Sequence, residues 1–81
     1  MYQTDWCPFC RRAEELLRKK GVAEIEMIEV VLDAKGRAAL QALTGRRTVP
    51  QIYIGQTHVG GCDDLYALDR AGKLDPLLAA A

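Results

Sequence analysis

A C-x-x-C motif at the start of a helical pattern constrains this chain more than any other feature. Cys7 and Cys10 enclose Pro8, and apolar residues then recur on one helical face until Gly21, a natural helix stop. Proline is favoured at the first position of a helix, because the N–H that it lacks has no partner there anyway. Since only six residues precede Cys7, the lead-in holds one short strand at 1–5. The fold is therefore expected to begin with a shortened strand followed by this helix.

The rest of the chain alternates strand and helix patterns, which is typical of an α/β domain. The pattern predicts strands at 24–31, 50–54 and 57–59, and helices at 33–43 and 62–71. The first strand, helix and second strand form a βαβ unit, which gives two parallel strands and a right-handed crossover. A two-residue turn at Gly55-Gln56 then adds an antiparallel hairpin. We expect a four-stranded mixed sheet with three helices, and an apolar tail that docks on it while its last residues fray.

Burial can be predicted for individual segments. The strand at 24–31 alternates at first and then runs apolar, as a strand covered on both faces does. Met27 and Leu65 are expected in the core. Trp6, directly before the first cysteine, is expected to be partly exposed, either as a docking surface for protein disulfides or as packing over the loop.

Length and charge exclude several classes of protein. The 81 residues form one domain, 1–81. Eleven basic and eleven acidic residues cancel, so the chain lacks the basic surface that binds nucleic acid. No apolar run approaches the roughly 20 residues of a membrane-spanning helix, and the lead-in lacks the features of a secretory signal. We therefore expect a cytoplasmic protein, in which a C-x-x-C pair is more often redox-active or metal-binding than structural.

The two cysteines of the motif occupy different environments. Positions i and i+3 of a helix are neighbours, so Cys7 and Cys10 can form a disulfide with their Cα atoms roughly 5.5 Å apart. Cys7 lies at the helix tip, where unpaired N–H groups and the helix dipole favour an anion and lower cysteine pKa values to about 3.5–7.5 in such motifs. Cys10 lies one turn further, on the apolar face. Cys7 is therefore the expected nucleophile and Cys10 the resolving thiol.

Two other interpretations of the cysteines stay open at this point. One is a structural disulfide, which a chain without secretory features does not favour. The other is a zinc site formed by Cys7, Cys10, His58 and Cys62, all of which are common zinc ligands. Structural zinc sites usually place C-x-x-C in a turn rather than at a helix opened by proline. A metal assay on the fully reduced protein would separate these interpretations.

Two further segments have the features of a binding site. In Thr48-Val49-Pro50, a cis peptide bond before the proline would expose the backbone of Val49 to an extended peptide. The segment 60–64, GGCDD, lies where a strand passes into a helix. Free N–H groups at a helix start attract a carboxylate, and an aspartate attracts an amine, so the segment suits an α-amino-acid head group. The alternative is a glycine turn in which the aspartates only cap the helix.

Three motifs together resemble the glutaredoxins, and most closely the short bacterial dithiol glutaredoxins of class 3. They are WCPFC, TVPQIYIG and GGCDDLYALDRAGKLDPLL, and the resemblance covers nearly the whole chain. It implies a thioredoxin-like fold with strand order 2-1-3-4 and a cis peptide bond at Pro50. It also implies thiol–disulfide exchange with glutathione as co-substrate, no metal, and a monomeric protein.

The resemblance also implies roles for individual residues. Cys7 would be the nucleophile and Cys10 the resolving thiol. The glutathione groove would be lined by Phe9, Arg47, Thr48, Val49, Pro50, Gly61, Cys62 and Asp63. Arg46 and Arg47 are the nearest fixed positive charges for the glycine carboxylate of glutathione. Two positions depart from the family pattern, since Phe9 replaces the usual tyrosine and Thr4 replaces a frequent lysine.

The expected activity is the glutathione-dependent reduction of protein disulfides and of protein–glutathione mixed disulfides. One alternative is a thioredoxin-like dithiol reductant fed by a flavin reductase, which would not need the amino-acid pocket at 60–64. Another is a dimer that bridges an iron–sulfur cluster, as some relatives do. Pro8 makes the helix tip too rigid to favour that second alternative.

Overall fold

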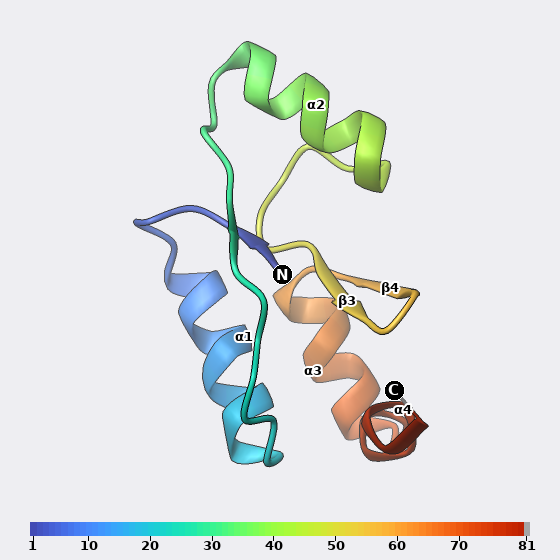
Figure 1. The fold of residues 1–81 in the computed structure, drawn as a ribbon. Helices are drawn as coiled ribbons and strands as arrows, with labels where there is room; N and C mark the ends of the chain where they lie inside the picture. The colour runs from blue at the N-terminus through green and yellow to red at the C-terminus, as the bar shows by residue number, and fades with distance from the viewer. Residues whose placement is uncertain (81) are drawn as a thin grey trace.

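Four strands and four helices make up the fold of residues 1–80, which is the part of the chain that this computed structural model describes (Figure 1). In chain order the elements are β1 (Tyr2–Gln3), α1 (Pro8–Lys19), β2 (Ile28–Glu29), α2 (Ala34–Thr44), β3 (Ile52–Ile54), β4 (Thr57–Gly60), α3 (Cys62–Arg70) and α4 (Leu74–Ala80). The predicted order of the first seven elements is confirmed. None of the helices within residues 1–80 combines the length and the apolar character that crossing a membrane requires.

The strands form two pairs rather than one continuous sheet. β1 and β2 pair in parallel, with Tyr2 opposite Ile28, and β3 and β4 pair antiparallel. A single bridge joins the pairs, in which the N–H of Tyr2 donates to the carbonyl of Gln51 over 2.9 Å and the N–H of Gln51 donates back over 3.1 Å. We expected one four-stranded sheet in the order 2-1-3-4. The difference follows from the length of β1, because two residues offer too few backbone groups to form ladders on both sides.

The expected burial of 24–31 on both faces is wrong. Only Ile28 and Glu29 of this run form a strand, and both are exposed. Met27 is 37% exposed instead of lying in the core, and Val31 is 69% exposed. Within residues 1–80, β2 has β1 as its one strand partner, so it is an edge strand, and an edge strand is only partly covered by its neighbours.

The core lies between the helix pair α1 and α3 and the hairpin β3–β4 (Figure 1). Leu65 is fully buried there, as predicted. The buried residues of this cluster are Met1, Ala13, Leu16, Leu17, Ile52, Ile54, Cys62, Leu65 and Leu74. Burying such apolar side chains contributes about 25 cal/mol per Å² of surface removed from water, which is the main stabilising term for a small domain.

The C-terminal tail docks on the core as predicted, but it does so as a helix, so the expected count of three helices is wrong. Leu74 is fully buried, and Leu77 and Leu78 pack partly buried against the same cluster. Their spacing of three and four residues places them on one face of a helix, which explains why the tail coils when it docks. The predicted fraying of the last residues falls in part on Ala81, which lies outside the described residues.

Residues at its two ends determine where α2 begins and where the loop after it starts. The side chain of Asp33 caps this helix by accepting the N–H of Gly36 over 2.7 Å. The helix ends at Gly45, whose φ of 81° is left-handed and whose N–H donates to the carbonyl of Gln41 over 2.8 Å. Glycine adopts this conformation without the steric cost of a Cβ, so the chain turns sharply here and enters the segment 46–50.

Candidate active site

Cys7 caps the first helix through its sulfur. Its backbone is extended, with φ −145° and ψ 99°, and Pro8 follows as the first helical residue. The Cys7 Sγ accepts the N–H of Cys10 over 3.1 Å, and the Cys7 carbonyl accepts the N–H of Arg11 over 3.1 Å. The predicted position of this sulfur at the helix tip is confirmed. The sulfur therefore lies at the helix terminus, where backbone N–H groups have no partners within the helix.

Cys10 lies one turn into α1 and is 2% exposed. Burial raises the pKa of the Cys10 thiol to about 12, and its hydrogen bond with the Cys7 side chain adds to the shift, while a hydrogen bond with the backbone of Thr4 opposes it. Both sulfurs are free thiols in this structure. The two thiols are therefore held differently: Cys10 keeps its proton at neutral pH, and the Cys7 sulfur accepts a backbone N–H at the helix tip.

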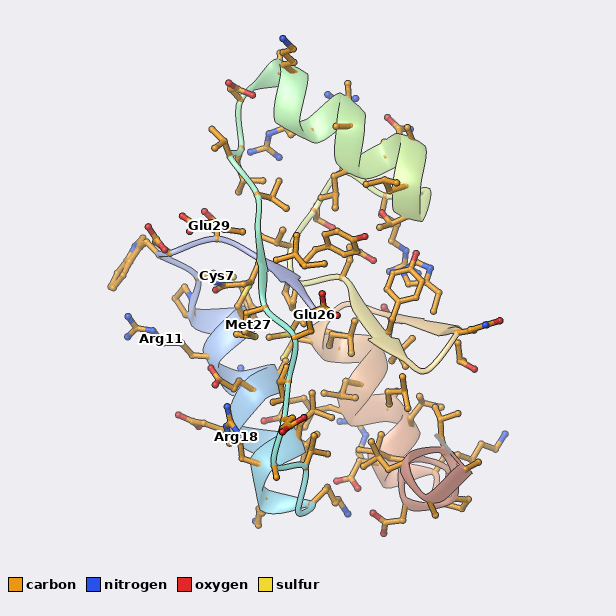
Figure 2. All side chains as sticks on the ribbon, in the orientation of Figure 1. Cys7, Arg11, Arg18, Glu26, Met27 and Glu29 are labelled. Atoms are coloured by element: carbon orange, nitrogen blue, oxygen red, sulfur yellow. The ribbon has the colours of Figure 1, made fainter. Side chains whose placement is uncertain are left out.

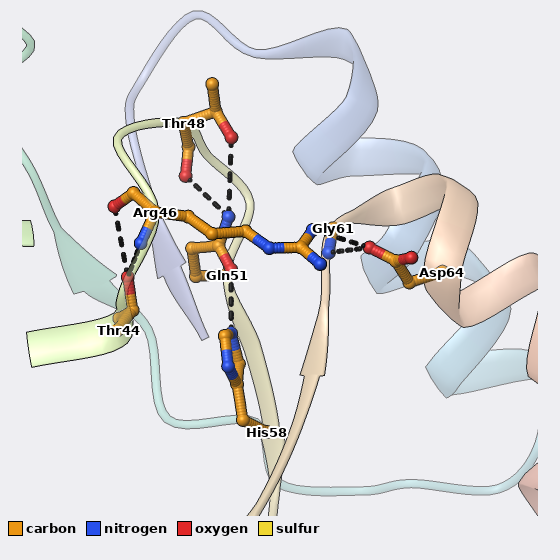
Figure 3. Close-up of polar contacts among 7 residues, drawn as sticks. All are labelled: Thr44, Arg46, Thr48, Gln51, His58, Gly61 and Asp64. Carbon is orange, nitrogen blue, oxygen red and sulfur yellow. Dashed lines mark hydrogen bonds and ion pairs between the residues drawn. The ribbon is translucent and has the colours of Figure 1, made fainter. Parts of the chain in front are cut away.

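The side chain of the buried residue Gln51 is hydrogen-bonded to the segment 46–50 (Figure 3). The Val49–Pro50 peptide bond is cis, as the family resemblance implied. Gln51 is fully buried, and its Nε2 donates to the carbonyl of Thr48 over 2.9 Å and, more weakly, to its Oγ1 over 3.4 Å. Its Oε1 lies 2.8 Å from the Nε2 of His58. Since Oε1 can only accept, this contact requires a proton on His58 Nε2.

The turn between β4 and α3 is organised by Asp64. One oxygen of its carboxylate, Oδ2, accepts the N–H of Gly61 over 2.9 Å and the Nη1 of Arg46 over 2.8 Å. These two bonds hold the pKa of Asp64 below its ordinary value, and the bond from Gly61 has the larger effect. Gly60 has a φ of 112°, and a Cβ there would lie 2.4 Å from Asp64 Oδ2, so only glycine fits. Asp63, the next residue back, is exposed.

The two arginines expected near the glycine carboxylate of glutathione have other partners. The Arg46 side chain joins the segment 46–50 to the start of α3 through Asp64. The Arg47 Nη1 donates to the Oε1 of Gln41 over 2.9 Å, which directs it toward α2. Arg46 is therefore a link between two segments of the site, and Arg47 would have to leave Gln41 to serve as the predicted contact.

Sequence reasoning did not single out Gln51, and it considered His58 as a possible zinc ligand. His58 stacks on Tyr53, with ring centroids 4.7 Å apart, and contacts Gln51. A polar residue within the apolar strand PQIYI was the signal that could have revealed the buried amide. The zinc interpretation required His58 as a ligand, and within residues 1–80 no group of three or more His, Cys, Asp or Glu side chains is placed to hold a metal ion.

The remaining predicted residues surround the cysteines. Cys62 opens α3 and is 5% exposed, and burial raises the pKa of its thiol although the charge of Arg12 opposes the shift. A raised pKa makes Cys62 a weaker nucleophile than an ordinary cysteine at neutral pH. Phe9 and Trp6 lie on either side of Cys7 in the sequence and are 53% and 78% exposed, so Trp6 is more exposed than expected.

Known proteins share this sequence and fold. The glutaredoxin family model matches residues 1–59. A glutaredoxin of Pseudomonas aeruginosa is 57% identical over 82 residues, which cover 99% of this chain and 94% of that protein. Glutaredoxin 3 of Escherichia coli strain K12 is 49% identical over 78 residues, which cover 96% of this chain and 93% of that protein.

Solved structures give the same result. The crystal structure of a wheat glutaredoxin superposes with a TM-score of 0.84 at 40% identity, covering 99% of this chain and 77% of that one. That of a buckwheat glutaredoxin–glutathione complex superposes with a TM-score of 0.78 at 34% identity, covering 98% and 74%. The fold is therefore the thioredoxin-like fold of these proteins. The chain belongs to the glutaredoxin family and is a thiol–disulfide oxidoreductase.

Proposed function

We propose that this protein uses glutathione to reduce protein disulfides and protein–glutathione mixed disulfides, through Cys7 as nucleophile and Cys10 as resolving thiol. The observation that carries the proposal is the Cys7 sulfur at the tip of α1, 3.1 Å from the N–H of Cys10, with a second, buried thiol one turn away. The similarity to a glutaredoxin solved in complex with glutathione supports glutathione as the co-substrate. A monomer that works in the cytoplasm without a metal or nucleic acid, as one domain 1–81, completes the proposal.

With a glutathionylated protein, the Cys7 thiolate attacks the glutathione sulfur. The protein–glutathione S–S bond breaks, the protein thiolate leaves and takes up a proton, and a Cys7–glutathione disulfide forms. A second glutathione thiolate then attacks the glutathione sulfur of this disulfide. Oxidised glutathione leaves and Cys7 returns as a thiolate. One reduced glutathione is therefore consumed per turnover, the other half of the oxidised glutathione comes from the substrate, and Cys10 is not needed.

With a protein disulfide, Cys7 attacks one substrate sulfur and the other leaves as a thiolate. Cys10 then loses its proton, attacks the Cys7 sulfur and releases the second substrate thiolate, so that a Cys7–Cys10 disulfide remains. Because the pKa of Cys10 is about 12, a base must take up its proton before the attack. The substrate thiolate released in the first step can be this base. Two molecules of glutathione then restore the dithiol.

The proposed glutathione site lies beside Cys7 between two segments. The backbone of Val49 would pair with the extended tripeptide, with Phe9, Thr48 and Pro50 beside it. The start of α3 would bind the γ-glutamyl head group. The N–H groups of Cys62 and Asp63 in its first turn suit a carboxylate, whereas that of Gly61 already binds Asp64. Because Asp64 already binds Arg46 and Gly61, the exposed Asp63 is the carboxylate left for the amino group.

The test follows the oxidised protein with each possible electron donor. Reduction by glutathione, coupled to glutathione reductase, supports the proposal, whereas reduction only by thioredoxin reductase and NADPH would show the alternative reductant. Cys7→Ser should abolish every exchange reaction. Cys62→Ser should retain the exchange chemistry, because that thiol is buried and takes no part in the steps above.

A further inference from the structure

An exposed aromatic–arginine pair lies next to the proposed nucleophile. Trp6 directly precedes Cys7 and is 78% exposed. The guanidinium carbon of Arg11 lies 5.5 Å from the centroid of the Trp6 ring, which is within the range of a cation–π contact. Figure 2 shows Arg11 extending outward from α1, on the side of the helix that faces away from α3. Neither side chain contributes to the core or to the bonds that hold the cysteines.

The Arg11 guanidinium keeps its hydrogen-bonding capacity. It forms no hydrogen bond or ion pair with the residues that the structure describes, whereas Arg18, Arg46 and Arg47 each bind an oxygen of another side chain. Stacking occupies the face of a guanidinium and leaves its in-plane N–H donors free. The carboxylate of Asp5, the neighbour of Trp6, forms no ion pair with Arg11 among the described residues.

A guanidinium that is held in place and lacks an acceptor is suited to a carboxylate. Arginine binds carboxylates through two parallel N–H bonds, and these are stronger than neutral hydrogen bonds. Because Trp6 already restricts the Arg11 side chain, less conformational entropy is lost when an acid binds. The flat, exposed ring of Trp6 can at the same time cover apolar parts of a peptide.

We propose that Trp6 and Arg11 form a docking site for protein substrates that carry an acidic residue near the target cysteine. This inference rests on the proposed function, because it requires protein thiols to reach Cys7. The carboxylate is assigned to the protein partner and not to glutathione. The segments proposed for glutathione are the loop 46–50 and the start of α3, with Phe9 beside them, whereas Arg11 points away from α3 (Figure 2).

The test compares matched peptide substrates. A series of heptapeptides carries a central glutathionylated cysteine and a single Glu at each flanking position in turn, and each has a Gln counterpart. At the best position the wild-type protein should show a kcat/KM about three- to tenfold higher for the Glu peptide than for the Gln peptide. Both peptides carry the same glutathione, so this ratio cancels any effect on glutathione binding.

Protein variants then test whether Arg11 causes the preference for the Glu peptide over the Gln peptide. Arg11→Gln should bring the ratio to about one, and Arg11→Lys should retain part of it, since the charge remains but the planar fork is lost. Arg70→Gln, which removes the same charge from the last turn of α3, should keep the wild-type ratio. Trp6→Ala should lower kcat/KM for both peptides. Raising the salt concentration should reduce the ratio, because exposed charges are screened.

Two results would overturn the docking site: a wild-type ratio near one at every position, or a ratio that Arg11→Gln leaves unchanged. A ratio that falls equally in Arg70→Gln would also overturn it, since the effect would then come from net charge. Failure of the proposed function looks different. In that case the wild-type protein would turn over neither the Glu nor the Gln peptides with glutathione as the only reductant.

Discussion

The buried amide of Gln51 offers the sharpest test of how the site is supported. Gln51 is fully buried, and its side chain connects the carbonyl of Thr48 to the ring of His58 (Figure 3). We consider Gln51→Met, which has a similar length and volume and cannot form either bond. The backbone pair between Gln51 and Tyr2 does not involve the side chain and should remain. The variant therefore isolates the amide from the strand that carries it.

The size of the effect follows from the two bonds. A hydrogen bond contributes about 1 kcal/mol net, and a buried partner left unpaired costs about 1–3 kcal/mol. Water can reach both partners in the variant, because Thr48 is exposed and His58 is only half-buried, so the cost per bond lies toward the lower end of this range. The near-equal volume keeps the packing cost under about 1.5 kcal/mol. We expect a loss of about 2–3 kcal/mol, which is a large share of the roughly 4–12 kcal/mol that stabilises a domain of this size.

Urea denaturation followed by circular dichroism measures this loss. With an m value of about 1.5 kcal/mol per M, a loss of about 2 kcal/mol lowers the midpoint by about 1.3 M. Gln56→Met makes the same chemical change at an exposed turn position and should stay within about 0.5 kcal/mol of wild type. The reasoning is refuted if Gln51→Met keeps the wild-type midpoint, or if Gln56→Met loses as much stability as Gln51→Met.

Three further predictions concern the thiols and the aspartate that joins the two segments. Cys10→Ser should keep deglutathionylation of small mixed disulfides but lose most dithiol reduction of protein disulfides; loss of both in kinetic assays would contradict the assigned roles. Because the pKa of Cys10 is raised to about 12, iodoacetamide at pH 7 should label Cys7 well before Cys10, and peptide mapping that found equal rates would contradict this order. Asp64→Asn should cost at most about 1 kcal/mol at pH 7, since its ion pair with Arg46 is exposed. A lowered carboxyl pKa stabilises the folded state above the ordinary value of 3.8. The stability difference between wild type and Asp64→Asn should therefore vanish as the pH falls below 3.8 through the lowered pKa. Urea midpoints measured between pH 7 and pH 2 test this prediction, and a difference that persists at the lowest pH would contradict it.

Much of the fold was predictable because the relevant signals are local. Pro8 marks the first turn of α1, and Asp33 and Gly45 mark the two ends of α2 through bonds that reach only three or four residues along the chain. The cap that Cys7 forms on α1 is also local, because its sulfur accepts the N–H of Cys10, three residues further along the chain. Such bonds form wherever the residue type allows them, so one sequence is enough to predict them.

The wrong predictions concern contacts between distant segments. The run 24–31 has the composition of a covered strand, yet its exposure depends on β2 having β1 as its strand partner in the described chain. The tail could be predicted to dock, but its helix depends on where Leu74 meets the core. Composition constrains neither outcome, because the same apolar residues fit several neighbours.

The amino-acid sequence by itself determined the position of the two motif cysteines, the helix that Cys7 caps and the family to which the chain belongs. Only the tertiary structure decided that Gln51 supports the Thr48 carbonyl, that Arg46 binds Asp64, and that Arg11 lies over Trp6 without an acidic partner among residues 1–80. The physical reason is range. Helix caps and turns are formed by groups a few residues apart, whereas the direction and the charge state of a side chain depend on which distant segments the folded chain brings beside it.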